Sequence, residues 1–150
     1  MSLTPENERR VWVTLRTSGI DPDGYAEEEQ TLRFPGRLTE NGGAYLLHYT
    51  ERIEDTSDTE VHLRLRPGKV MMMRQGDYSV SLIFEVGKHY EGVYHTPFGD
   101  LDITVETLML SDHISAKQGD VLIRYDESVS GQPAGVRTMR ISYALRGAQC

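Results

Sequence analysis

The sequence predicts an all-β protein, folded as a single antiparallel up-and-down β-barrel of about eight to ten strands. Turn-forming residues divide the chain into about ten segments of roughly 6–14 residues. Within several segments, apolar and polar residues alternate. Sustained helical periodicity is missing. Gly, Asn, Asp and Pro in turns such as 41–43, 67–68 and 131–135 let the chain reverse.

The alternation is clearest in residues 59–66, where every second residue is apolar. It also occurs in residues 10–16, 78–86 and 101–107. A period of two places one set of side chains inside and the other in water. The outer set is rich in Thr, Arg and Glu, which suits a solvated antiparallel sheet.

Helical signals are weak. The acidic start at residues 4–8 could form a cap and a first turn, or it could be a frayed terminus. A second short helical turn is expected near residues 111–117.

Short connections place sequence neighbours side by side, and closure of the barrel removes exposed sheet edges. No linker or repeat interrupts residues 1–150, which predicts one domain. A barrel of this size either holds one small ligand or fills its interior with side chains. The sequence leaves both possibilities open.

Composition excludes several classes of protein. The chain has 16 Lys and Arg against 23 Asp and Glu, a formal net charge of −7, which disfavours nucleic-acid binding. The single cysteine, Cys150, cannot form an internal disulfide. No apolar run reaches about 18 residues, and no basic, apolar leader opens the sequence. We therefore expect no membrane partner and a cytoplasmic location.

Three stretches carry a family resemblance. They are GRL at 36–38 leading to YLLHYTE at 45–51, VMMMRQG at 70–76, and YHTPFGDL at 94–101. In order and spacing they resemble the YwiB-like calycins, small bacterial lipocalin-like barrels without an established function. The resemblance spans essentially the whole chain and implies a calycin barrel. It implies no reaction, because a fold does not determine a function.

The third stretch is the most specific. We expect structural roles for Thr96, Pro97 and Gly99, because a strand ends there, proline fixes φ and glycine permits the reversal.

The aromatic residues are mainly tyrosines, eight against three phenylalanines. Several share a strand face with apolar residues, and a buried phenol needs a hydrogen-bond partner. They either line a pocket for a small amphipathic molecule or bond to backbone and trapped water in a filled barrel. The candidate lining residues are Tyr45, Tyr49, Glu51, Met72, Arg74, Tyr90, Tyr94, Tyr125 and Tyr143.

Two charged residues share the phase of apolar neighbours, Glu51 with Tyr49 and Arg74 with Met72. An inward charge is costly unless paired. We expect Glu51 and Arg74 to pair inside the barrel or at its rim, through the planar guanidinium.

Catalytic and metal motifs are not found. The sequence has no Gly-x-Ser-x-Gly elbow, P-loop or dinucleotide fingerprint. His89 and His95 lie six residues apart, roughly 20 Å along a strand, too far to share an ion. We therefore expect no enzyme activity, no cofactor and no metal.

The leading interpretation is non-enzymatic binding of a small amphipathic molecule in a tyrosine-lined interior. The alternative is a structural or protein-interaction module, a filled barrel that could form a homodimer. Trp12, Met71, Met73 and Ile83 lie out of phase with the inner face and could supply its outer apolar patch. A third possibility is a barrel-mouth enzyme acting on a lipid-like substrate.

Overall fold

The computed structural model describes residues 8–52 and 57–147, which form ten antiparallel strands and no helix. The strands are β1 (Arg9–Ile20), β2 (Ala26–Asn41), β3 (Ala44–Glu51), β4 (Thr59–Arg66), β5 (Lys69–Gln75), β6 (Val80–Phe84), β7 (His89–Thr96), β8 (Gly99–Ile114), β9 (Gln118–Val129) and β10 (Gln132–Leu145). They make one sheet in the order β6-β5-β4-β3-β2-β1-β10-β9-β8-β7. This order confirms the predicted up-and-down topology.

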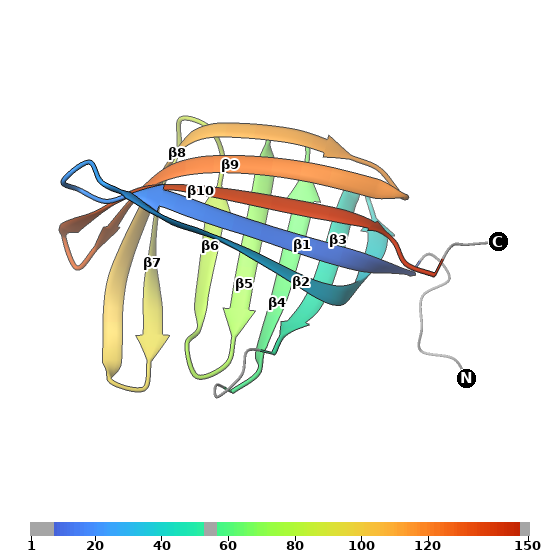
Figure 1. Cartoon of the computed structure of the whole chain (residues 1–150), viewed down its shortest axis with the longest axis horizontal. Helices are drawn as coiled ribbons and strands as arrows, with labels where there is room; N and C mark the ends of the chain where they lie inside the picture. Colours follow the sequence, from blue (N-terminus) through green and yellow to red (C-terminus); the bar gives the residue numbers. More distant parts are fainter. Residues whose placement is uncertain (1–7, 53–56, 148–150) are drawn as a thin grey trace.

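The barrel closes between β6 and β7. Ser79 and His95 form an isolated antiparallel bridge, with N–H···O distances of 2.9 and 2.8 Å. Figure 1 shows the nearly closed barrel, in which β1, β9, β10, the first part of β2 and the last part of β8 run across the strands β3 to β7.

The two long strands β2 and β8 each change their pairing partner along their length. The first half of β2 pairs with β1 alone, residues 36–38 pair with both β1 and β3, and residues 39–41 pair with β3. Gly36 marks the change. A Cβ there would lie 2.8 Å from Cγ2 of Val13 and 2.9 Å from the carbonyl oxygen of His48. A glycine at this corner lets neighbouring backbones approach closely.

The predicted alternation is confirmed in its main features. Along β4, Val61, Leu63 and Leu65 are buried, while Arg64 between them is exposed. Inward side chains from all ten strands make one continuous core. Burial of this apolar surface is the main stabilising contribution to such a fold. The alternation over 78–86 was predicted too long, because β6 ends at Phe84 and the flanking Tyr78 and Val86 are exposed.

The helical turn predicted near residues 111–117 is wrong. β8 continues to Ile114, because Leu110 and Ile114 pack against the core from this strand. The chain then turns at Ser115, whose hydroxyl donates to the carbonyl oxygen of Gln118 at 2.8 Å. Residues 4–7 of the other expected turn lie outside the described residues. In the described ranges, the structure contains no helix able to cross a membrane.

Candidate ligand-binding site

The predicted charge pair is present inside the barrel. Arg74 of β5 donates from Nη1 to Oε2 of Glu51 at 2.9 Å and from Nη2 to Oε1 at 2.5 Å. Glu51, the last residue of β3, is 4% exposed. Burial alone would lower the pKa of Arg74, but the hydrogen bonds and charge of Glu51 raise it. The pair is therefore a fixed, mutually neutralising unit.

Tyr49 lies two residues earlier on the same inner face and is 2% exposed. Its ring stacks on Phe34 at a centroid distance of 5.4 Å. Its hydroxyl is buried and forms no hydrogen bond with any described residue. The carboxylate of Glu51 is its charged neighbour. Burial and the Glu51 carboxylate raise the pKa of this phenol. A buried hydroxyl without a partner costs free energy.

Tyr94 and Tyr125 bring two further phenols towards this charge pair. Burial raises the pKa of Tyr94, and the cation of Arg74 partly offsets that rise. Burial and Glu127 raise the pKa of Tyr125, whereas Arg137 and Arg74 act in the opposite direction. Arg74 therefore lies within electrostatic range of both phenols. The ring of Tyr125 packs on Phe84 at 4.9 Å, so this side chain joins the core to the polar region.

A second charged cluster lies beyond Tyr125. Arg137 of β10 is opposite Tyr125 of β9 in the sheet. Its Nη1 bonds to Glu27, its Nε lies 3.4 Å from Oε1 of Glu127, and its Nη2 donates to the Ala134 carbonyl oxygen at 3.2 Å. Arg137 is thus held by two carboxylates at once.

Gly19 makes room for this cluster. A Cβ at Gly19 would lie 2.8 Å from Nη1 of Arg137 and 3.1 Å from Oε1 of Glu27. The glycine lies where the β1–β2 register shifts, between the pairs Thr17↔Gln30 and Gly19↔Glu27. This β-bulge adds one residue to β2, so that Glu27 and Glu28 both reach the same cleft.

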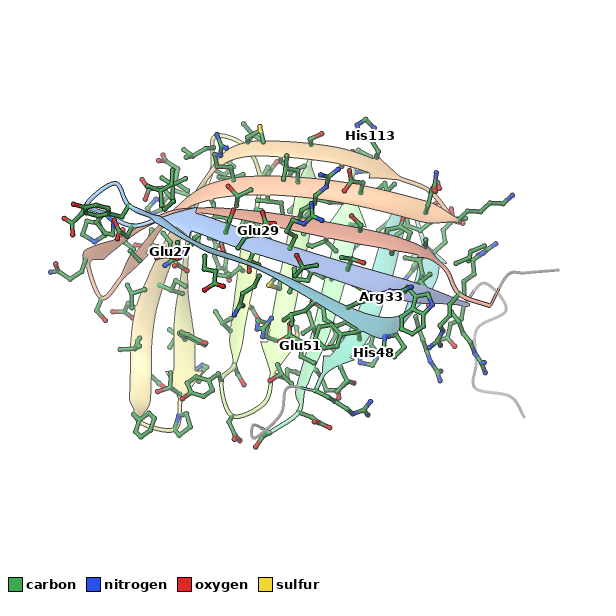
Figure 2. The ribbon with its side chains drawn as sticks, viewed as in Figure 1. Glu27, Glu29, Arg33, His48, Glu51 and His113 are labelled. Atoms are coloured by element: carbon green, nitrogen blue, oxygen red, sulfur yellow. The ribbon has the colours of Figure 1, made fainter. Side chains whose placement is uncertain are left out.

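The cleft has a volume of about 410 Å³ and opens beside β1, β2 and β10. Its volume lies within the range of about 300–1,000 Å³ typical of small-molecule sites. Figure 2 shows Glu27 and Glu29 along β2, and Glu51 at the end of β3. The lining residues are Thr17, Ser18, Glu27, Glu28, Gln30, Tyr125, Arg137, Thr138 and Met139.

The nine predicted lining residues therefore divide into groups. Tyr49, Glu51, Arg74, Tyr94 and Tyr125 occupy the polar end of the barrel, and Tyr125 alone of the nine lines this cleft. The other four, Tyr45, Met72, Tyr90 and Tyr143, lie elsewhere and have packing roles.

Tyr143 is a structural residue. Its hydroxyl donates to the carbonyl oxygen of Ser115 at 2.7 Å and accepts from the Ser115 N–H at 3.2 Å. Its ring occupies the space above Gly119, where a Cβ would lie 2.1 Å from a ring carbon. Burial raises the pKa of Tyr143 to about 12, although the bond to Ser115 opposes the rise. Tyr45 acts electrostatically on this phenol and is partly buried against the same core.

Met72 is 5% exposed and fills the core. Tyr90 lies at the β6–β7 seam, with its ring close to Gly92 and Gly92 close to the Ser81 carbonyl oxygen. An aromatic ring over a glycine covers backbone that would otherwise be exposed. Neither side chain contributes a polar group to the cleft of Tyr125.

The motif residues Thr96, Pro97 and Gly99 shape the β7–β8 hairpin. The Thr96 hydroxyl donates to the Gly99 carbonyl oxygen at 2.6 Å and accepts from the Phe98 N–H at 3.1 Å. Gly99 has φ of 129°, which favours glycine. Because His95, just before this turn, bonds to Ser79, the hairpin also closes the barrel.

The outer face over β3 to β6 carries a different cluster. His48 and His62 stack with centroids 4.3 Å apart and planes 5° apart. Nε2 of His48 lies 2.7 Å from Oε1 of Glu60. Burial and His48 lower the pKa of His62.

Met71 and Met73 are exposed beside this histidine pair and line a groove of about 330 Å³. Ile83 lines the same groove. Trp12 does not join it, because Trp12 lies on β1, where the Arg33 guanidinium is 4.2 Å from its ring centroid. The predicted outer patch therefore lacks Trp12.

Metal-binding geometry is not seen: within residues 8–52 and 57–147, no three His, Cys, Asp or Glu side chains are grouped to hold an ion. Sequence reasoning missed Arg137 and its partners. Arg137 shares the phase of Met139 and Ile141, so strand periodicity contained a signal for it. Glu27 and Glu28 are exposed strand residues, and the bulge that turns them to the cleft has no distinct sequence signal.

Comparisons with known proteins agree with this fold. A family model described as a domain of unknown function, DUF1934, matches residues 13–141. The crystal structure of the ywiB protein from Bacillus subtilis superposes with a TM-score of 0.83 at 22% sequence identity, covering 94% of each chain. No curated protein matches the sequence. The structural similarity confirms the predicted calycin-like barrel and indicates the fold alone.

Proposed function

The chain belongs to the DUF1934 family of domains of unknown function, and on that premise we propose that it is a non-enzymatic barrel that binds a small amphipathic molecule at its polar mouth. The observation that carries this proposal is the open cleft of about 410 Å³ beside Tyr125 and Arg137. The body of the barrel is filled by buried side chains, so the proposed ligand lies at the mouth.

The lining of the cleft suits a molecule with both polar and apolar parts. Tyr125 and Met139 offer apolar surface, and Tyr125 continues into the core through Phe84. Thr17, Gln30 and their polar neighbours in the cleft offer hydrogen-bonding groups. A few polar groups around an apolar floor are typical of small-molecule sites.

Several contacts hold the Arg137 side chain in place in this cleft, and this order favours ligand binding. Arg137 is held by Glu27, Glu127 and a backbone carbonyl, and Gly19 leaves space for its guanidinium. A site whose side chains are already ordered loses less conformational entropy when a ligand binds.

Native mass spectrometry of freshly purified protein tests this proposal. We expect a reproducible extra mass that is lost on denaturation. The variant Gln30→Trp, which fills the cleft, should abolish that mass. Glu29→Trp is the matched control, because Glu29 lies 3.7 Å from the outward Arg16 and does not line the cleft. Retention of the guest by Gln30→Trp would contradict the proposed position.

The second candidate function is a protein-interaction module. It is favoured by the groove beside Met71, Met73 and Ile83 on the outer face. Exposed apolar patches on a monomer often mark interaction sites. Sedimentation of the wild type and of Met73→Lys tests it: a concentration-dependent dimer lost in the variant would favour this function, and a monomer throughout would count against a homodimer.

A further inference from the structure

We propose that the mouth cleft selects an organic cation, such as an alkyl amine or diamine, and rejects carboxylates. This inference rests on the proposed function, since it names the chemical class of ligand for the same cleft. It follows from three features of the described residues: the number of carboxylates at the cleft, the occupation of the two nearby guanidinium groups, and the unpaired state of one carboxylate.

Carboxylates outnumber cations at the cleft. Glu27 and Glu28 line it, and Glu127 lies behind Arg137, the one cation among the lining residues. Three carboxylates therefore lie at or beside the cleft, against one guanidinium, and two of the three pair with it. A cleft lined by one sign of charge attracts ligands of the opposite sign and repels those of its own.

The guanidinium groups are not available to an anion. Arg137 is paired with Glu27 and Glu127, and Arg74 is paired with Glu51. An incoming carboxylate would have to displace one of these partners and leave it without compensation. Leaving a charge unpaired in a partly buried place is costly.

Glu28 is the free acceptor. Within the described part of the chain, its side chain has no ion pair or hydrogen bond, and it lines the cleft. The bulge in β2 turns Glu28 towards the cleft next to Glu27, whereas Glu29 faces outwards to Arg16. An ammonium group bound here would donate a charge-assisted hydrogen bond to a carboxylate that loses no protein partner.

The aromatic side of the cleft also suits a cation. Tyr125 is partly buried and lines the cleft together with Met139. A tyrosine face attracts an ammonium or guanidinium group electrostatically. The alkyl part of an amine can cover Met139 while its charged end meets Glu28.

The experiment compares three six-carbon chains that differ only in their end groups: hexamethylenediamine, hexanediol and adipate. Isothermal titration calorimetry measures their affinities for the full chain at neutral pH. We expect the diamine to bind at least about tenfold more tightly than the diol, as one added charge-assisted hydrogen bond implies, and adipate to bind most weakly. Added salt should weaken binding of the diamine and leave that of the diol unchanged.

Glu28→Gln and Glu29→Gln form a matched pair of variants, because they make the same change on adjacent, oppositely facing residues. We expect Glu28→Gln to weaken diamine binding about tenfold. Glu29→Gln should change it less than about twofold, because that carboxylate lies outside the cleft. Equal effects of both variants would overturn the assignment of Glu28.

The remaining outcomes separate the two proposals. If adipate or the diol binds as tightly as the diamine, the cation inference is wrong and small-molecule binding stands. If none of the three binds and the native protein retains no guest, both proposals are overturned. If none binds but a guest is retained, the charge of the released guest decides: a cation supports the inference, and a neutral or anionic guest overturns it.

Discussion

Glu51 and Arg74 meet inside the barrel through two parallel hydrogen bonds, although they stand on different strands and are 23 residues apart in sequence. Strand β4 lies between β3 and β5 in the sheet, so the long arginine side chain reaches past it. The contact therefore links two strands that share no backbone ladder.

Removing one member of this pair should destabilise the fold. We expect Glu51→Gln and Arg74→Met each to lower the free energy of unfolding by about 2–4 kcal/mol, because each leaves a buried polar partner uncompensated. The double variant should lose less than the sum, with a coupling of about 1–3 kcal/mol. Denaturant unfolding followed by circular dichroism measures this, and strictly additive losses would contradict the coupling.

Replacement of Tyr49 and of Tyr143 by phenylalanine should have different effects on the stability of the fold. Tyr143→Phe loses the bonds to Ser115 and should cost about 1 kcal/mol. Tyr49→Phe removes a hydroxyl that has no partner in the described residues, so its stability should be unchanged or raised by up to about 1 kcal/mol. Thermal unfolding of the two variants provides the comparison. A larger loss from Tyr49→Phe would show that its hydroxyl has a stabilising partner.

Gly119 should be intolerant of a side chain. A Cβ there would overlap the ring of Tyr143, which lies opposite in the β9–β10 ladder. We expect Gly119→Ala to cost about 1–3 kcal/mol, as overpacking does. Gly131→Ala is unsuitable as a control because its φ is 79°. Gly119→Ala combined with Tyr143→Leu should instead recover part of the loss, and no recovery would contradict the steric explanation.

Stability should fall in alkali. Burial raises the pKa of Tyr143 from 10.0 to about 12, and it raises the pKa values of Tyr49 and Tyr125 as well. Above pH 10, the unfolded chain releases these protons more readily than the folded chain. The free energy of unfolding should therefore be unaffected by these groups below pH 10 and decrease between about pH 10 and pH 12.

Phenolate absorbance during an alkaline titration checks this expectation. The three buried phenols should ionise together with loss of the native circular dichroism. Tyr143→Phe should reduce the slope of stability against pH in this interval. Ionisation of all phenols near pH 10 while the fold persists would contradict the burial argument.

The pKa of His62 on the outer face should depend on His48 and Glu60. Burial and His48 lower the pKa of His62, whereas Glu60 raises it. We expect His48→Asn to raise the pKa of His62 towards 6.5, and Glu60→Gln to lower it further. Imidazole proton shifts measured by NMR against pH provide the values. An unchanged pKa in both variants would show that the rings do not interact in solution.

The amino-acid sequence by itself determined the fold class, the approximate strand count and most of the inner face. Alternation along β4 and the turn residues between strands are local properties, and they act the same way wherever the strand lies. The Glu51–Arg74 pair was also predictable, because an inward charge requires a partner. The length of β8 was not predictable, because residues 110–114 have a weak local preference for a strand and are held there by the packing of Leu110 and Ile114 on the core.

Only the tertiary structure decided where the mouth lies and which residues form it. Tyr45 and Tyr143 have the same residue type and strand phase as Tyr125, yet Tyr125 alone lines the cleft. Position around the barrel depends on which strand meets which, and the bulge opposite Gly19 depends on the match between β1 and β2. Such long-range register has no local sequence signal, because it results from packing the whole sheet around one core.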